Sequence, residues 1–302
     1  GADLVAAAKA AKLERPMNPL HHPRFLRAYW LLPHHLLNQS FARLMRAQRP
    51  ARAVTAAIDL WAKRARINRA EFEPGPYASL EAFFLRRLKP GARPLHPGLV
   101  APVDGHVVAA GDLREDTQLL VKGQSLSLQR VVNGQAQHQL PLSAYQGGRY
   151  VVLFLSPRGY HYVHMPDAGQ VVGVQWLPGR YFPQNDAALQ HIPAVYEQNE
   201  RLVLRCALSP APQPKPPAEL LLVMVGASLV GGINLRGLPR AQFSQPHAVP
   251  CHLDRQKGEE LGHFTFGSTV VLLLPRGAYG ESQVPPIGSE VRMGETLFAP
   301  GL

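Results

Sequence analysis

From residue 94 onward, the apolar residues of this 302-residue chain stand in short runs that are separated by turn residues. Runs of this length, bounded by Gly, Pro, Asn or Asp, predict β-strands rather than helices. The predicted strands lie at residues 100–109, 118–122, 149–155, 170–177, 201–207, 219–225, 229–234, 260–266 and 268–274. We therefore predict a β-rich domain over residues 94–302, built from packed antiparallel sheets.

A weak internal repeat bears on how these strands are joined. The segments Lys257-Gly258-Glu259-Glu260-Leu261 and Arg292-Met293-Gly294-Glu295-Thr296-Leu297 share the order basic, Gly, Glu, Leu. Turns of this kind join strands in lipoyl-like β-sandwiches, so the domain is expected to contain lipoyl-like hairpins. Residues 209–217 are rich in proline and lack the backbone donors that a sheet needs, so they predict a surface loop or an extended spacer.

The N-terminal part of the chain has a helical pattern instead. Over residues 17–93, apolar side chains recur at helical spacing between cations and predict three basic amphipathic helices. Ser79 can cap a further short helix at residues 80–88. We interpret residues 1–16 as an expression remnant or a flexible tail, with Met17 as the natural start. Helices followed by a β-rich core give an α+β fold.

The net charge of +11 lies entirely in residues 1–93. Residues 1–93 hold 17 Lys+Arg and 6 Asp+Glu, and the other 15 Lys+Arg and 15 Asp+Glu cancel. Basic helices that carry aromatic residues are typical of a membrane interface, where each cation near an anionic surface contributes about 1 kcal/mol. The candidate membrane contacts are Phe25, Tyr29, Trp30, Phe41 and Trp61. The alternative is an ordinary helical bundle with a solvated basic face.

Several classes of protein fit the sequence poorly. No apolar run approaches the ~18 residues that span a bilayer, and no signal-peptide pattern is present, so a soluble or peripheral protein is expected. No nucleic-acid-binding motif is visible. Cys206 and Cys251 form no disulfide framework, which favours a reducing compartment, and their spacing does not support a zinc site.

The bond between Gly267 and Ser268 stands at the head of the most apolar predicted strand, and a tight bend is expected there. Because glycine has no Cβ, the carbonyl of Gly267 can be approached closely, and a neighbouring hydroxyl could attack it. The alternative is a strand that follows an ordinary turn.

Three further residues are candidates for proton transfer. Asp104 stands in the segment Pro102-Val103-Asp104-Gly105, where it is either a reactive acid or a plain turn aspartate. His161 and His164 lie three residues apart between Pro and Gly residues that favour an irregular turn. Histidine moves protons best near neutral pH, although both could instead be buried and satisfied.

Several short segments follow one another in a specific order along the chain. They are Phe83-Phe84-Leu85-Arg86-Arg87-Leu88 with Arg93-Pro94, Pro102-Val103-Asp104-Gly105, Tyr160-His161-Tyr162-Val163-His164-Met165-Pro166, Pro178-Gly179, Asn199-Glu200-Arg201, Val225-Gly226-Ala227 with Val230-Gly231, and Lys257-Gly258-Glu259-Glu260-Leu261-Gly262-His263-Phe264 leading into Gly267-Ser268-Thr269. In these segments the chain resembles the bacterial membrane-associated phosphatidylserine decarboxylases, from about Met17 to the C-terminus. The family usually has Leu where Phe266 stands, but no departure removes a reactive group.

The resemblance implies an enzyme that makes its cofactor from its own chain. Ser268 attacks the carbonyl of Gly267, with His164 as the base and Asp104 orienting it, and the chain is cut into residues 1–267 and 268–302. Ser268 becomes a covalent pyruvoyl group, a pyruvate cofactor that acts as an electron sink, and no metal is required. Phosphatidylserine then loses carbon dioxide to give phosphatidylethanolamine, and His161 protonates the carbanion.

The resemblance also implies partners and a location. Residues 17–93 would attach the protein peripherally to an anionic phospholipid membrane on the cytoplasmic side of the cell membrane. The two fragments would form a heterodimer, and a homodimer of the whole protein also fits. Two other classes stay open: a hydrolase that uses Asp104, His164 and Ser268 on an external substrate, and a non-catalytic lipid-binding protein that does not mature.

Overall fold

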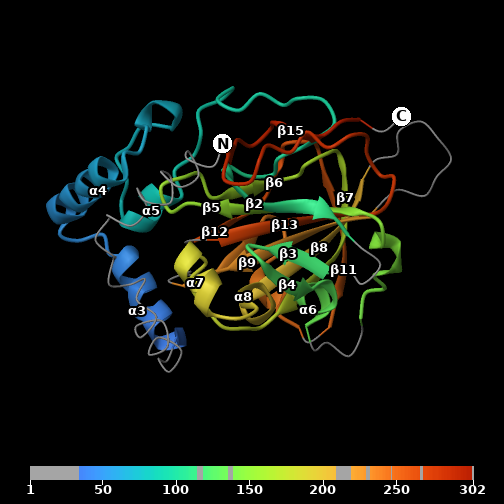
Figure 1. The fold of residues 1–302 in the computed structure, drawn as a ribbon. Helices are drawn as coiled ribbons and strands as arrows, with labels where there is room; N and C mark the ends of the chain where they lie inside the picture. The colour runs from blue at the N-terminus through green and yellow to red at the C-terminus, as the bar shows by residue number, and fades with distance from the viewer. Residues whose placement is uncertain are drawn as a thin grey trace, which may run out of the picture.

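The computed structural model describes residues 34–113, 118–134, 139–208, 219–228, 232–245, 247–265 and 268–300, without the side chains of residues 34–38 and 186–187. Several predictions fall outside the described residues, namely those on residues 1–16, Phe25, Tyr29, Trp30, residues 209–217 and Gly267. Within the described part, a few helices precede a β-rich core of antiparallel sheets, which confirms the predicted α+β fold (Figure 1).

One large antiparallel sheet of eight strands forms the core (Figure 1). In spatial order its strands are β11 (Val249–Arg255), β7 (Gly169–Leu177), β8 (Arg201–Leu208), β9 (Glu219–Gly226), β13 (Ser268–Leu274), β5 (Arg149–Leu155), β2 (Gly105–Asp112) and β14 (Glu290–Val291). The strand β13 therefore lies inside the sheet, hydrogen-bonded to β9 on one side and to β5 on the other.

The large sheet is covered on both faces, which explains why β13 is apolar at successive positions rather than at alternate ones. Val270 and Leu272 point into one core with β6 (Tyr162–His164), β10 (Ile233–Leu235), β12 (Glu260–Phe264), β1 (Leu99–Val100) and β15 (Thr296–Phe298). Val271 and Leu273 point into a second core with β3 (Gln118–Val121), β4 (Gln124–Ser127), α6 (Leu128–Asn133), α7 (Asp186–His191) and α8 (Val195–Gln198). Each buried Val or Leu contributes about 1.5–3 kcal/mol, so the strand is held firmly in place.

The smaller sheets contribute to the two cores that cover the faces of the large sheet. They are the three-stranded sheet β10-β12-β6 and the pairs β1-β15 and β3-β4. The remaining short helices are η2 (Arg69–Glu71), η3 (Ser143–Tyr145) and α9 (Arg240–Phe243).

The internal repeat forms the same turn twice. Gly258 and Gly294 both have positive φ, at 75° and 93°, which a residue with a side chain rarely adopts. In each turn the glutamate that follows the glycine accepts a hydrogen bond from a backbone N–H three residues earlier, at 2.9 Å from Gln256 to Glu259 and from Arg292 to Glu295.

The N-terminal helices pack onto one side of the sheet domain (Figure 1). They are α3 (His34–Met45), α4 (Ala51–Ala65) and α5 (Leu80–Phe84). Ser79 caps α5 as predicted, because its side chain accepts a hydrogen bond from the N–H of Ala82 at 3.1 Å. Among the described residues, no helix combines the length and the apolar character that crossing a bilayer would require.

Some predicted elements were wrong in detail. The helix predicted at residues 80–88 ends at Phe84. The strand predicted at 100–109 is interrupted by a bend at residues 102–104, and β2 begins only at Gly105. The irregular turn expected around the two histidines is partly a strand, because β6 pairs with β12 from Tyr162 to His164. The strands β4, β11, β14 and β15 were not predicted, since most are short and depend on distant partners.

Candidate active site

Ser268 is the first residue of β13, where it pairs with Leu155 of β5 and Gly226 of β9. Its exposed fraction is 0%, and its Oγ has no hydrogen-bond partner among the described residues. Leaving a buried hydroxyl unpaired costs about 1–3 kcal/mol, and such groups are uncommon in folded proteins. The hydroxyl therefore needs an explanation other than stability.

Buried amides fix β13 itself and the neighbouring strand β9 beside this serine. The side chain of Gln184 accepts a hydrogen bond from Thr269 Oγ1 at 2.7 Å and donates one to the carbonyl of Gly226 at 2.8 Å. Asn199 donates to the same carbonyl at 2.8 Å. The backbone around Ser268 is thus pinned while its own hydroxyl is left free.

His161 stands directly before β6 and is fully buried. Its Nδ1 lies 3.1 Å from the carbonyl of Gly159, so Nδ1 carries the proton and Nε2 carries the lone pair. Nε2 has no partner within the described part of the chain, and the ring of Phe84 lies 3.8 Å from the imidazole, centroid to centroid. Burial, and then the charge of Arg86, lower the pKa of His161 to about 3, although the Gly159 bond opposes this. The ring is neutral at physiological pH.

One loop, residues 155–161, connects the surroundings of the two unpaired groups, the Oγ of Ser268 and the Nε2 of His161. The N–H of Phe264 donates to the carbonyl of His161 at 3.1 Å, and Ser268 pairs with Leu155. The loop between Leu155 and His161 therefore contacts the start of β13 at one end and the end of β12 at the other. No hydrogen bond links His161 to Ser268 among the described residues, but Ser268 pairs with one end of this loop and His161 forms the other end.

His164, at the end of β6, has both ring nitrogens occupied. Nδ1 lies 2.8 Å from the carbonyl of Gly258, and Nε2 lies 2.9 Å from the hydroxyl of Tyr160. Because a carbonyl can only accept, Nδ1 donates and Tyr160 donates to Nε2. Burial lowers the pKa of His164, while the Gly258 bond and nearby carboxylates partly oppose the shift.

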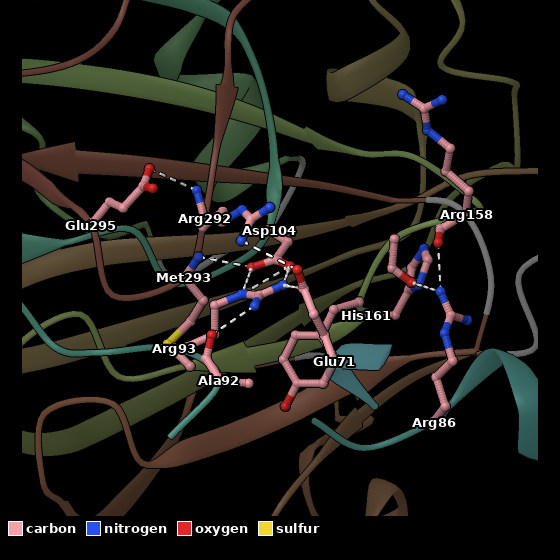
Figure 2. Close-up of polar contacts among 12 residues, drawn as sticks. Glu71, Arg86, Ala92, Arg93, Asp104, Arg158, His161, Arg292, Met293 and Glu295 are labelled. Atoms are coloured by element: carbon pink, nitrogen blue, oxygen red, sulfur yellow. Dashed lines mark hydrogen bonds and ion pairs between the residues drawn. The ribbon is translucent and has the colours of Figure 1, made fainter. Parts of the chain in front are cut away.

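Asp104 is paired with an arginine rather than with His164. Its carboxylate accepts hydrogen bonds from Arg93, at 2.9 Å to Nε and 2.5 Å to Nη2, and from the N–H of Met293 at 2.8 Å. Arg93 also lies 2.9 Å from Glu71, and Figure 2 shows it between the two carboxylates. The contact expected between Asp104 and His164 is therefore not formed, since a bidentate guanidinium and a backbone donor occupy the carboxylate.

The repeated turns hold one of these residues each. The turn at Gly258 presents a carbonyl to His164, and the turn before Gly294 presents the N–H of Met293 to Asp104. Two copies of one turn thus position two of the predicted site residues.

A cavity of about 260 Å³ opens beside Asp104, between the end of α4 and the loop after β5. Arg93 and Tyr160 also line it, so it borders the partners of both Asp104 and His164. The other lining residues are Arg66, Ile67, Asn68, Glu71, Phe72, Gly105, His106, Ser156, Arg158, Gly159, Glu290, Val291 and Arg292.

The helical region reaches the site through Phe84. Phe41 and Trp61, two of the candidate membrane contacts, are partly buried and pack with Met45, Phe84 and Ala227. Ala227 follows the Gly226 that pairs with Ser268, and Phe84 contacts His161. In contrast, Leu44 and Leu60 on α3 and α4 are 64% and 51% exposed.

A family model described as phosphatidylserine decarboxylase matches residues 80–299. The chain belongs to the phosphatidylserine decarboxylase family. The match to this decarboxylase family includes Arg86, Asp104, His161, His164 and Ser268 but begins after α4.

Relatives within the phosphatidylserine decarboxylase family cover most of the chain. A phosphatidylserine decarboxylase proenzyme of Pseudomonas putida is 33% identical over 293 residues, which cover 91% of this chain and 97% of the relative. Those of Bordetella pertussis and Brevibacillus brevis are 32% and 34% identical, over 93% and 80% of this chain and 96% and 86% of their own lengths.

Sequence reasoning missed several partners within this decarboxylase site. Arg86, Arg93 and Tyr160 stood inside the segments that carried the resemblance, but no role was assigned to them. Gln184 stood in none of those segments. A buried arginine or amide is recognisable only once its partners are known, so no local pattern could have identified these contacts.

Proposed function

We propose that this chain converts phosphatidylserine to phosphatidylethanolamine with a pyruvoyl group made from its own Ser268. Membership of the family supports the decarboxylation, and the word proenzyme in the relatives' names supports a maturation step. The observation that carries the proposal in this chain is the buried Oγ of Ser268 at the head of β13, which has no partner in the part of the chain that the structure describes.

Maturation would begin with a shift of the chain from nitrogen to oxygen. The Oγ of Ser268 bonds to the carbonyl carbon of Gly267 while the peptide C–N bond breaks, which gives an ester and a free amino group. Loss of the Cα proton and cleavage of the Cβ–Oγ bond then leave Gly267 with a carboxylate. Addition of water and loss of ammonia convert the remaining residue into the pyruvoyl group.

The surroundings of Ser268 fit the product better than the serine. Maturation turns the CH₂–OH group into a methyl group, so the mature protein no longer buries an unpaired hydroxyl. The Gln184–Thr269 hydrogen bond and the pairing with β5 and β9 would hold the group at the head of β13. When present, its ketone would supply an electrophile for the substrate amine and an electron sink. The same pairing would keep the fragment 268–302 bound to 1–267.

His161 is proposed to move a proton at Nε2. Since Nδ1 donates to Gly159, a neutral His161 has no proton on Nε2 to give and must first accept one. The substrate amine arrives as an ammonium and reacts only after losing a proton, so it is the natural donor. His161 would hold that proton and return it to the substrate carbon after carbon dioxide leaves.

His164 and Asp104 are proposed to serve maturation. His164 would act as the base toward Ser268, with Asp104 orienting it. That role requires new hydrogen-bond partners at both residues, because Tyr160 occupies Nε2 of His164 and Arg93 occupies Asp104.

The proposed place of action is the cytoplasmic surface of the cell membrane. The excess charge of +11 in residues 1–93 would favour an anionic surface. Leu44 and Leu60 are exposed on the same helices and could enter the interface, whereas Phe41 and Trp61 are partly used inside the fold.

Intact-mass measurement and a denaturing gel test the proposal together. Wild-type protein should give two pieces, residues 1–267 and 268–302, with the smaller one carrying a pyruvoyl end in place of serine. Ser268→Ala should remain one chain, whereas Ser282→Ala, an exposed serine in the same fragment, should be cut normally. A cut Ser268→Ala protein, or an uncut wild type that still decarboxylates, would refute the proposal.

A further inference from the structure

Arg86 carries a guanidinium group that is buried without an acid. Its exposed fraction is 1%, and no carboxylate pairs with it among the described residues. Its two terminal nitrogens donate instead to three carbonyls, those of Phe83 at 3.1 Å, of Gly159 at 2.8 Å and of Arg158, while Nε has no partner among the described residues. Buried charges are usually paired with an opposite charge, so this arrangement calls for a reason.

Aromatic rings stabilise the cation in place of an acid. The guanidinium carbon lies 4.4 Å from the ring centre of Phe72 and 5.1 Å from that of Phe83. Burial is the main cause that lowers the pKa of Arg86, to about 10, so the group stays charged at neutral pH. The fold therefore keeps a positive charge at a place where a neutral side chain would be less costly.

The carbonyl of Gly159 links this charge to the site. It accepts one hydrogen bond from Nη2 of Arg86 and one from Nδ1 of His161, so its two lone pairs are both used. Figure 2 shows Arg86 beside Arg158 and His161. With the Arg158 carbonyl held as well, the loop that precedes His161 cannot rotate its carbonyls away. The ring of Phe84 lies against the imidazole.

We propose that Arg86 is the positioning residue for His161: it holds the Gly159 carbonyl so that the proton stays on Nδ1 and Nε2 keeps a free lone pair. This inference rests on the proposed function, in which Nε2 of His161 moves a proton. Arg86 would not touch the substrate and would act only through Gly159 and its charge.

The charge of Arg86 has a second effect. Arg86 is the charged group that shifts the pKa of His161 among the described residues, and the imidazole also contacts the neutral ring of Phe84 and the Gly159 carbonyl. A nearby cation disfavours the imidazolium, so it helps keep His161 of the free enzyme neutral, with the lone pair on Nε2 unprotonated.

The test compares Arg86→Met, Arg86→Lys and the control Arg87→Met in the full mature enzyme. Arg87 is adjacent in sequence but 53% exposed, and it pairs with Glu260. The tautomer of His161 is measured by nitrogen-15 NMR, and kcat by turnover of phosphatidylserine in detergent micelles across pH. In Arg86→Met we expect mixed tautomers, a fall in kcat of about 10-fold to 100-fold, and an acid limb of kcat/KM moved to higher pH.

Arg86→Lys separates the charge from the geometry. Lysine keeps the charge, so its acid limb should stay with wild type, but one ammonium cannot hold both carbonyls as a guanidinium does, so kcat should fall part of the way. Arg87→Met should match wild type in all three measurements.

Several results would overturn the inference. A folded Arg86→Met with the wild-type tautomer and pH profile would do so. If Arg86→Met does not fold, an Arg86→Lys enzyme with wild-type kcat and tautomer would reduce Arg86 to a structural role. Should His161→Gln keep full turnover, the proposed role of His161 fails, while the tautomer signal still shows whether Arg86 orients the ring.

Discussion

The two histidines of the site stand three residues apart and are treated in opposite ways by the fold. Among the described residues, Nε2 of His161 has no partner, its neighbouring cation Arg86 has no acid, and the hydroxyl of Ser268 is unpaired. His164 has both nitrogens bonded, and Asp104 is held by Arg93 and Met293. The region around His161 thus has polar atoms without hydrogen-bond partners among the described residues, whereas in the region of His164, Asp104 and Arg93, called the saturated region below, the site groups are hydrogen-bonded. We infer that the first is ready to react, whereas the second must exchange partners before it can.

The largest effects that test this difference are expected from replacing His161 or His164. His161→Gln should be cut normally into its two fragments but lose kcat by at least about 100-fold, the usual share of positioned proton transfer. His164→Gln should instead slow the cutting and leave turnover of any mature enzyme closer to wild type. A denaturing gel over time and an assay for released carbon dioxide measure the two steps.

His252→Gln, an exposed histidine on β11, is the control for both measurements. If His161→Gln blocks cutting as strongly as His164→Gln does, the division of labour between the two regions is wrong.

The next effect concerns the stability of the saturated region. Arg93 is 5% exposed and pairs with Asp104 and Glu71, which are 16% and 27% exposed. Arg93→Met would leave Asp104 without its cation and Glu71 with only the exposed Arg292, at 3.3 Å. We therefore expect a loss of about 2–3 kcal/mol, below the 3–5 kcal/mol of a fully buried pair because water reaches both acids.

Urea unfolding of the uncut Ser268→Ala protein measures this loss on a single chain. Arg69→Met is the matched control, because its ion pair with Asp59 is 47% and 58% exposed and should change stability little. An Arg93→Met protein no less stable than Arg69→Met would show that the saturated region is not held by this cluster.

The sequence indicates the central strands well and the contacts of the site poorly. The predictions for residues 149–155 and 268–274 coincide with β5 and β13, because strands buried on both faces appear as long apolar runs between turns. The short strand β6 is set by pairing with β12, about a hundred residues later, and no local pattern marks it. The motifs indicated Asp104, His161 and Ser268, but the Gly159 carbonyl between Arg86 and His161 is a backbone group that no side-chain pattern can reveal.

The smallest effect is the response of stability to acid. The pKa of His161 is lowered to about 3 in the folded protein, against an ordinary value near 6.5. Between these values the unfolded chain binds a proton that the folded chain does not, so the free energy of unfolding falls as pH falls below about 6.5, by at most about 1.4 kcal/mol per pH unit for one histidine. The pKa of His164 is lowered too, but its Gly258 bond and nearby carboxylates oppose the effect of burial. His161→Gln should therefore flatten the loss of stability between pH 6.5 and 4 more than His164→Gln does.

Urea unfolding at several pH values in the Ser268→Ala background gives the slopes, with His252→Gln as the control. Equal slopes for the two variants would mean that the fold lowers the pKa of both histidines equally. The contrast between His161 and His164 would then rest on their hydrogen bonds alone.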